Sequence, residues 1–434
     1  MGNLLARVKV RWWLFIVGRK RKHEQYAEAL EVLHKVVAIQ PQRALAFVQA
    51  GYCLAKLNRH EEALRSYARA LEIAPNYGEA HAYMGLTYHD LGRYREALES
   101  LNRAIRMKPC LTDDPYWLYM LGLTSGHAEQ WEQSLAAFTK LTASNSRYGN
   151  AWHGLGWALA HLNRESEALV PLQHAIQLDP QNASACRELG ECYYRLERFK
   201  EALEQFQEYK KLKPNDPAGH HSLAMTYCGL REFSSAVEPL LQALRLGPEF
   251  GEVYFNLGMV YSELGQHEDA VASFQEAIRL EPNNSDYYCR LAASYLILQK
   301  QEEAVLAAKE ALRIKPDSGD PYYLVGCALH EPGTYLEAIA AYQKSLELNP
   351  GQLEVLVNLG DAYLHLDRPE EARTILGRAG TLESNDAKLH HRLAELYLNL
   401  GMRAEAVREH ETLRRLDPSL AHALTKLLDV LPQP

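Results

Sequence analysis

The chain has 434 residues, of which 47% are hydrophobic and 24% charged, a composition typical of soluble, folded proteins. Its formal net charge is −8, yet residues 1–23 contain seven basic side chains and no acidic one. The remainder is therefore clearly acidic, which argues against nucleic-acid binding along its length, because phosphate contact requires clustered Lys and Arg.

The first 23 residues combine aromatic and basic side chains. The apolar run that begins at Trp12 and ends at Val17 is too short to span a bilayer, which needs about 20 apolar residues. We interpret the segment as a degenerate first helix that packs through Trp13. The alternative is an interfacial membrane anchor, in which aromatic side chains enter the headgroup region and basic ones contact anionic lipid. Its residues would be Trp12, Trp13, Phe15, Arg19, Lys20, Arg21 and Lys22.

A repeated pattern covers the rest of the chain, and residues 251–284 show it most clearly. One helical stripe there contains Tyr254, Leu257, Gly258 and Tyr261, a second contains Ala270, Phe274 and Ala277, and Pro282 ends the unit. The pattern recurs in units that start at residues 10, 44, 78, 115, 149, 183, 217, 251, 285, 319, 353 and 387. The eighth place is Gly or Ala in every unit except the first, and the twentieth is Ala in every unit except that of Ser134.

This spacing resembles the tetratricopeptide repeat, W-x2-L-G-x2-Y…A-x3-F…P, in which another aromatic residue replaces the Trp. The resemblance implies an all-α fold, a right-handed α-solenoid superhelix of about twelve stacked helix-turn-helix units. We expect a basic extension at residues 1–9, the repeat array at residues 10–420, and a capping helix with a tail at residues 421–434.

Local signals agree with this division. Asp114-Pro115 and Asp216-Pro217 place an N-cap acid before a first-turn proline where units begin. Pro171 and Pro239 fall inside predicted second helices, where we expect kinks unless they face outward as tolerated defects. Three extra residues near 111–113 should lengthen one loop between units.

No segment remains for a catalytic domain, and no phosphate-binding loop, dinucleotide turn, nucleophile elbow or zinc-protease motif occurs. We therefore predict no enzyme activity, no cofactor and no metal site. Seven scattered cysteines without a C-x-x-C pair favour reduced thiols and a cytoplasmic location, with peripheral membrane contact as the alternative.

In this family the first helix of each unit lines the concave groove, chiefly through its second, fifth, sixth, ninth and thirteenth places. Aromatic and methionine side chains at such places suggest a surface that buries apolar side chains of a partner. The alternative is that some of them pack against adjacent units. The predicted groove residues are Tyr116, Tyr119, His153, Trp157, Arg187, Tyr194, His221, Met225, Phe255, Asn256 and Met259.

Relatives that hold chaperone tails use a five-residue carboxylate clamp. Asn358, Lys388 and Arg392 match three of its positions, whereas Tyr323 and Cys327 replace the first Lys and Asn. We do not predict chaperone binding, but Lys388 and Arg392 could hold a single acidic group; the alternative is ordinary exposed charges.

The resemblance implies a non-enzymatic scaffold or adaptor that binds a peptide or partner helix in its groove. A membrane-associated assembly factor and an accessory subunit of a separate enzyme remain alternatives. Neither the partner nor the oligomeric state follows from the sequence, since one architecture serves unrelated ligands.

Overall fold

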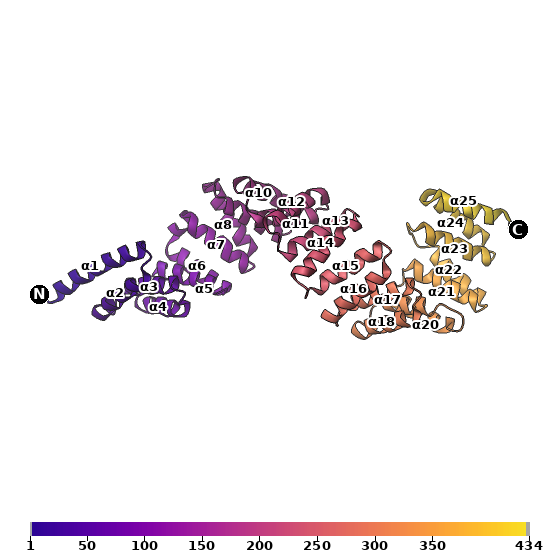
Figure 1. Cartoon of the computed structure of the whole chain (residues 1–434), viewed down its shortest axis with the longest axis horizontal. Coiled ribbons are helices and arrows are strands. Elements are labelled where there is room, and N and C mark those ends of the chain that lie inside the picture. The colour runs from indigo at the N-terminus through magenta and orange to yellow at the C-terminus, as the bar shows by residue number, and fades with distance from the viewer. Residues whose placement is uncertain (1, 431–434) are drawn as a thin grey trace. The chain divides into compact units, whose positions relative to one another are not determined.

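The computed structural model describes residues 2–430, which form α-helices and one short 3-10 helix and contain no strand (Figure 1). The chain divides into two compact units, and the division falls between Pro214 and Asn215. The all-α solenoid architecture predicted from the repeats is confirmed.

The first unit contains six helix pairs in chain order. They are α1 (Gly2–Lys22), α2 (Tyr26–Ile39), α3 (Ala44–Lys56), α4 (His60–Ile73), α5 (Gly78–Asp90), α6 (Tyr94–Met107), α7 (Pro115–His127), α8 (Trp131–Ser144), α9 (Gly149–His161), α10 (Glu165–Leu178), α11 (Ala183–Arg195) and α12 (Phe199–Leu212). The 3-10 helix η1 (Pro109–Asp113) lies between α6 and α7.

The second unit contains another six pairs and a final helix. They are α13 (Pro217–Gly229), α14 (Phe233–Leu246), α15 (Gly251–Glu263), α16 (His267–Leu280), α17 (Ser285–Ile297), α18 (Gln301–Ile314), α19 (Gly319–Ala328), α20 (Tyr335–Leu348), α21 (Leu353–His365), α22 (Pro369–Ala379), α23 (Ala387–Asn399), α24 (Arg403–Leu416) and α25 (Pro418–Val430).

Both ends of the array differ from the expected boundaries. Helix α1 begins at Gly2, so residues 2–9 continue the first helix instead of forming a separate extension. Helix α25 begins at Pro418, three residues before the expected capping helix, because Asp417 accepts hydrogen bonds from the backbone N–H groups of Ser419 and Leu420.

In eight of the twelve helix pairs, a glycine in the first helix lies against a large side chain in the second. In α15 and α16, a Cβ atom added to Gly258 would lie 2.6 Å from Cε1 of Phe274, whose side chain is fully buried. The same close approach joins Gly51 to Tyr67 and Gly360 to Leu376. The glycines of the eighth place thus let the two helices meet at a distance that a larger residue would not permit.

The turn within each pair follows one backbone rule. In each of the twelve repeats, the residue at the fifteenth place has a positive φ, from 54° at Asp367 to 99° at Gly333. Glycine occupies this place only at Gly92, Gly265, Gly333 and Gly401, and the other eight units put a side chain into the left-handed region.

Asp114 and Asp216 accept backbone hydrogen bonds as N-caps of α7 and α13, as expected. The loop expected near residues 111–113 is the 3-10 helix η1, which Leu111 anchors by packing into the core at 7% exposure. Helices α10 and α14 each continue through their internal proline, and Pro171 is buried instead of facing outward.

All seven cysteines are free. Among the described residues, no helix has the length and apolar character needed to cross a bilayer.

Candidate functional site

A hollow with a volume of about 840 Å³ lies along the first helices α3, α5 and α7. We call it the aromatic groove because tyrosine and tryptophan rings form much of its wall. Its lining residues include Tyr52, Lys56, His60, Tyr67, Tyr83, His89, Asp90, Tyr116, Trp117 and Met120.

The rings of the groove contact one another in a continuous series. The centroids of Tyr52 and Tyr83 are 5.3 Å apart, those of Tyr83 and Trp117 are 5.9 Å apart, and those of Trp117 and Tyr116 are 5.4 Å apart. All three contacts are edge-to-face, an arrangement that aromatic rings prefer and that holds each ring in place. Tyr116 stays 52% exposed at the end of this series.

Two cations border the groove without acidic partners. The guanidinium of Arg21 lies 4.1 Å from the centroid of the Tyr52 ring, and Nζ of Lys56 lies 5.8 Å from it. Neither side chain forms an ion pair within residues 2–430, and the buried Nε of Arg21 has no hydrogen-bond partner there. These charges are therefore available to an incoming carboxylate.

Two histidines of the groove also contain unsatisfied polar atoms. Both ring nitrogens of His89 and the Nδ1 of His60 are buried without a hydrogen bond from the described part of the chain. Burial lowers the pKa of His89, although nearby Asp90 opposes this effect. Burial also raises the pKa of Tyr116. Buried polar atoms without partners cost free energy, so ligand hydrogen bonds to these imidazoles would be favourable.

The predicted groove residues have mixed surroundings. Tyr116 lines the aromatic groove. Tyr119 instead packs on Phe138, with ring centroids 6.0 Å apart, and Phe255 stacks on Tyr287 at 4.7 Å. Trp157 fits against Gly126, where an added Cβ would lie 2.2 Å from the ring. Tyr119 therefore packs on the second helix of its own pair, whereas Phe255 and Trp157 fill space between neighbouring pairs, which is the alternative considered above.

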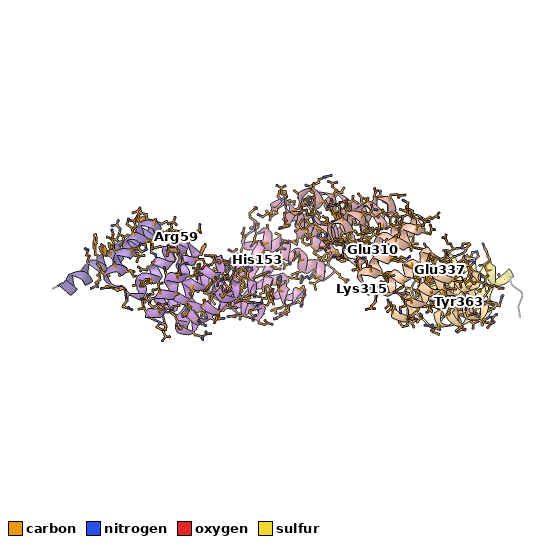
Figure 2. The ribbon with its side chains drawn as sticks, turned by 90° about the horizontal axis from the view of Figure 1, so that it is seen from below. Arg59, His153, Glu310, Lys315, Glu337 and Tyr363 are labelled. Carbon is orange, nitrogen blue, oxygen red and sulfur yellow. The ribbon has the colours of Figure 1, made fainter. Side chains whose placement is uncertain are left out.

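A second group of predicted residues surrounds Arg187, on α11. Its guanidinium donates to Glu188 at 2.9 Å and to Glu191 at 3.2 Å. His153, on α9 and labelled in Figure 2, has a buried Nε2 without a hydrogen-bond partner, and burial together with the charge of Arg187 lowers its pKa to about 4. Burial raises the pKa of Glu188 to about 7. Tyr194 contacts Phe199 edge-to-face at 5.4 Å.

In the second unit, two predicted residues bond to each other. Nδ2 of Asn256 and Nε2 of His221 are 2.8 Å apart, and burial lowers the pKa of His221. Met225 and Met259 are half-buried, and Met259 packs against the core around Phe274.

Two of the three residues that match part of the carboxylate clamp, Asn358 and Arg392, already bind each other. Nη1 of Arg392 donates to Oδ1 of Asn358 at 2.7 Å, and Nη2 donates to Oδ2 of Asp361 at 2.6 Å. Nδ2 of Asn358 donates to the hydroxyl of Tyr323 at 3.4 Å. Lys388 is exposed. An acidic ligand would have to compete with Asp361 for Arg392.

At the N-terminus, the predicted anchor residues divide between two faces of α1. Trp13 packs on the core around Val10 and Val17, whereas Trp12 and Phe15 are 61% and 64% exposed. Arg19 and Lys22 are also exposed, whereas Lys20 pairs with Glu28 and Arg21 lies on Tyr52.

The groove residues predicted from the sequence begin at Tyr116, so they include only one end of the aromatic groove. The prediction missed Tyr52 and Tyr83, although they occupy the ninth and sixth places of their units and therefore carried the required signal.

The helix pairs and their groove define a repeat protein of the interaction-scaffold class. Five sequence profiles, each described as "Tetratricopeptide repeat", together match residues 42–109, 119–183, 166–225, 251–284, 273–305 and 329–387. The chain belongs to the tetratricopeptide repeat family.

Several solved structures are similar to parts or most of this chain. YrrB, described as a TPR protein with an unusual peptide-binding site, is 23% identical over 43% of this chain and 96% of its own, with a TM-score of 0.40. MamA is 22% identical over 37% of this chain and 95% of its own, with a TM-score of 0.37. The APC/C hetero-tetramer Cut9–Hcn1 is 16% identical over 96% of this chain and 89% of its own, with a TM-score of 0.45. No curated protein matches the chain.

Proposed function

We propose that this scaffold binds an extended peptide segment of a partner protein in the aromatic groove. The observation that carries the proposal is the continuous series of rings from Tyr52 to Tyr116. It lies next to two cations without acidic partners and to buried imidazole nitrogens without hydrogen bonds. Apolar side chains of the peptide would pack on Tyr83, Tyr116 and Trp117. An acidic side chain or terminus would pair with Arg21 and Lys56.

The groove suits an extended segment because its rings lie in sequence along three helices. A peptide main chain could bond to His60 and His89, whose buried nitrogens are unsatisfied. A proline-rich strand would satisfy the same geometry at low entropic cost, since aromatic-lined grooves accept polyproline helices.

The test is selection of peptides from a displayed random library on the full chain, followed by fluorescence polarisation with a selected peptide. Tyr116→Ala should weaken binding by roughly 10- to 30-fold, and Tyr116→Phe should retain most of the affinity, because the ring supplies the contact. Val170→Ala is the matched control, since Val170 is 68% exposed on α10, outside the groove. Equal loss in the control, or none in Tyr116→Ala, would refute groove binding.

A second candidate function is peripheral membrane attachment through α1. Exposed Trp12 and Phe15 lie on one helical stripe with Arg19 and Lys22, the arrangement of an interfacial helix. In flotation with phosphatidylserine vesicles, the full chain should associate and the Trp12→Ala/Phe15→Ala variant should not. Equal flotation of both proteins would exclude this candidate.

A further inference from the structure

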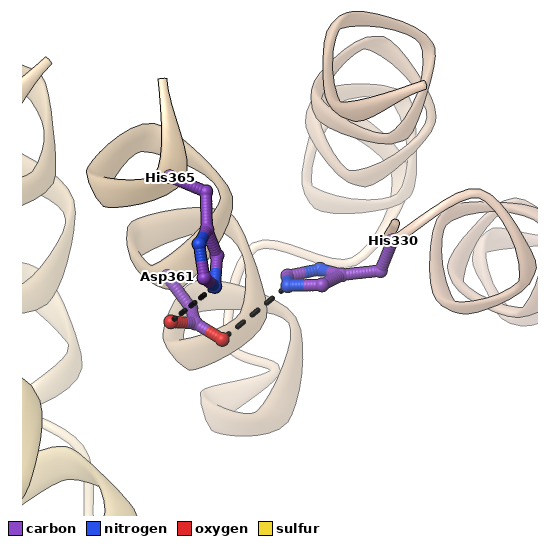
Figure 3. A group of neighbouring side chains, drawn as sticks. All are labelled: His330, Asp361 and His365. Carbon is purple, nitrogen blue, oxygen red and sulfur yellow. Dashed lines mark ion pairs between the residues drawn. The ribbon is translucent and has the colours of Figure 1, made fainter. Parts of the chain in front are cut away.

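Three potential metal ligands converge in the second unit, where α21 faces the turn after α19 (Figure 3). Asp361 and His365 are four residues apart on α21, so they lie on one helix face. His330 approaches from the turn that follows α19. One ligand atom from each residue lies within 4.8 Å of the others, and we call these residues the Asp361 cluster.

The two imidazoles approach opposite oxygens of the carboxylate. Nε2 of His330 lies 3.3 Å from Oδ2 of Asp361, and Nε2 of His365 lies 3.7 Å from Oδ1. In a tetrahedral zinc site with bonds of about 2.0–2.1 Å, ligand atoms are about 3.3 Å apart. The widest separation of the cluster therefore has to close by about 1.5 Å. His365 can supply this movement because its side chain is 51% exposed.

Neighbouring side chains hold the ligands as a metal site requires. Nδ1 of His330 lies 3.2 Å from the hydroxyl of Tyr342, a fully buried residue. When Nδ1 donates this hydrogen bond, Nε2 carries the lone pair needed for coordination. That Nε2 is buried and receives no directed hydrogen bond from the described residues. The ring of His365 stacks on Tyr335 at 4.8 Å, which sets its plane.

The carboxylate of Asp361 is oriented by an ion pair. Its partner is the guanidinium of Arg392, and the Asp361 side chain is 18% exposed. Arg392 donates to Oδ2 at 2.6 Å and leaves Oδ1 for an ion. Since Arg392 adds positive charge beside the site, we expect affinity below that of a structural zinc site.

We propose that His330, Asp361 and His365 bind a divalent transition-metal ion such as Zn²⁺, through two imidazole nitrogens and one carboxylate oxygen. Zinc accepts this ligand set, and three protein ligands leave a fourth position for water or a partner's side chain. The site lies in the second unit and is independent of the aromatic groove in the first, so failure of either proposal leaves the other intact.

The experiment is isothermal titration of the chelator-stripped full chain with Zn²⁺, supported by the visible spectrum of bound Co²⁺. We expect one site per chain with micromolar affinity. His330→Gln and His365→Gln should each reduce that affinity by at least tenfold. Tyr342→Phe should reduce it by about tenfold, because it removes the hydroxyl that contacts Nδ1 of His330 and orients the ring. His422→Gln, at an exposed position of α25, is the matched control and should bind as the parent does.

Absence of a Co²⁺ spectrum in the parent chain would overturn the proposal. So would parent-like affinity in the His330→Gln/His365→Gln double variant, because the ion would then be held by other histidines. Far-UV circular dichroism of each variant shows whether a loss of binding comes from unfolding. A lower metal affinity of Tyr342→Phe, with an unchanged circular dichroism spectrum and an unchanged melting curve, would support coordination by His330.

Discussion

The aromatic groove and the Asp361 cluster use the same places of the repeat for different chemistry. The ninth place of a first helix is Tyr52 in the groove and Asp361 in the cluster, and the thirteenth is Lys56 in one and His365 in the other. The places that join the two helices of a pair do not vary in this way, since Gly51 and Gly360 each leave room for a large buried side chain. The repeat therefore conserves its framework and leaves groove chemistry free to change.

The largest expected difference between the two units is in the stability lost when a buried acidic residue is replaced. Glu409, on α24, is 7% exposed and lies 2.6 Å from Nδ1 of buried His390. Glu409→Ala leaves Nδ1 of that buried imidazole without a partner, while Nε2 keeps its contact with the backbone O of Ser384 at 3.0 Å, and we expect a loss of about 3–5 kcal/mol of stability. Glu188→Ala should cost under about 2 kcal/mol, because Arg187 keeps its bond to Glu191.

Urea unfolding followed by hydrogen exchange of the α23 and α24 amides measures this difference locally, which matters because long repeat arrays do not unfold in one step. If Glu188→Ala lost more stability than Glu409→Ala, the prediction that Glu409 and His390 form the stronger buried pair would be wrong.

The pH dependence of the first unit should contain two opposing contributions. Folded Glu188 holds its proton up to a pKa of about 7, so its contribution to stability falls as pH rises from about 4.5 to 7. Folded His153 resists protonation down to about 4, so its contribution is lost as pH falls from about 6.5 to 4. Each change amounts to about 3 kcal/mol, and the two nearly cancel in the parent chain.

Single variants should separate the contributions. Glu188→Gln should become less stable on acidification from pH 6.5 to 4.5, and His153→Gln should become more stable. In the second unit, the pKa of Asp361 is lower in the folded chain than in the unfolded chain. The stability that its ionised form contributes is therefore present above the unfolded pKa and is lost as pH falls through the folded pKa. Urea midpoints across this range provide the measurement, and parallel curves for the two variants would contradict the opposing signs.

The helix-pair framework should respond alike in both units. Leucine at Gly51 would overlap Tyr67, and leucine at Gly360 would overlap Leu376, since an added Cβ already lies 2.5 Å from each neighbour. We expect each variant to lose about 1–3 kcal/mol.

The matched controls for this comparison are Gly18→Ala and Gly377→Ala. Both glycines lie in helices, and an added Cβ would meet nothing within 4 Å. Alanine there should be neutral or should stabilise by up to about 1 kcal/mol through helix propensity. If a control variant melted at a lower temperature than the leucine variant of the same unit, the glycines at positions 51 and 360 would not determine how closely the helices approach.

The framework was predictable because its constraints are local and repeated. From α3 to α23, the first helices begin at the residues where the 34-residue pattern starts its units. Whether Tyr119 and Phe255 face the groove or pack inside the array was not predictable, because it depends on contacts with Phe138 and Tyr287 in other helices. The Asp361 cluster had only one local signal, the four-residue spacing of Asp361 and His365, since His330 comes from another unit of the repeat.

The turn within each pair should give the smallest effect and the same one in both units. Glu129 and Gln299 have φ angles of 61° and 57°, where a side chain costs about 1 kcal/mol relative to glycine. Glu129→Gly and Gln299→Gly should therefore stabilise by about 0.5–1 kcal/mol, and Gly92→Ala, at φ 71°, should destabilise by a similar amount. Urea midpoints test all three variants. A gain at one turn and a loss at the other would mean that contacts outside the backbone, different in the two units, decide which residue the turn accepts.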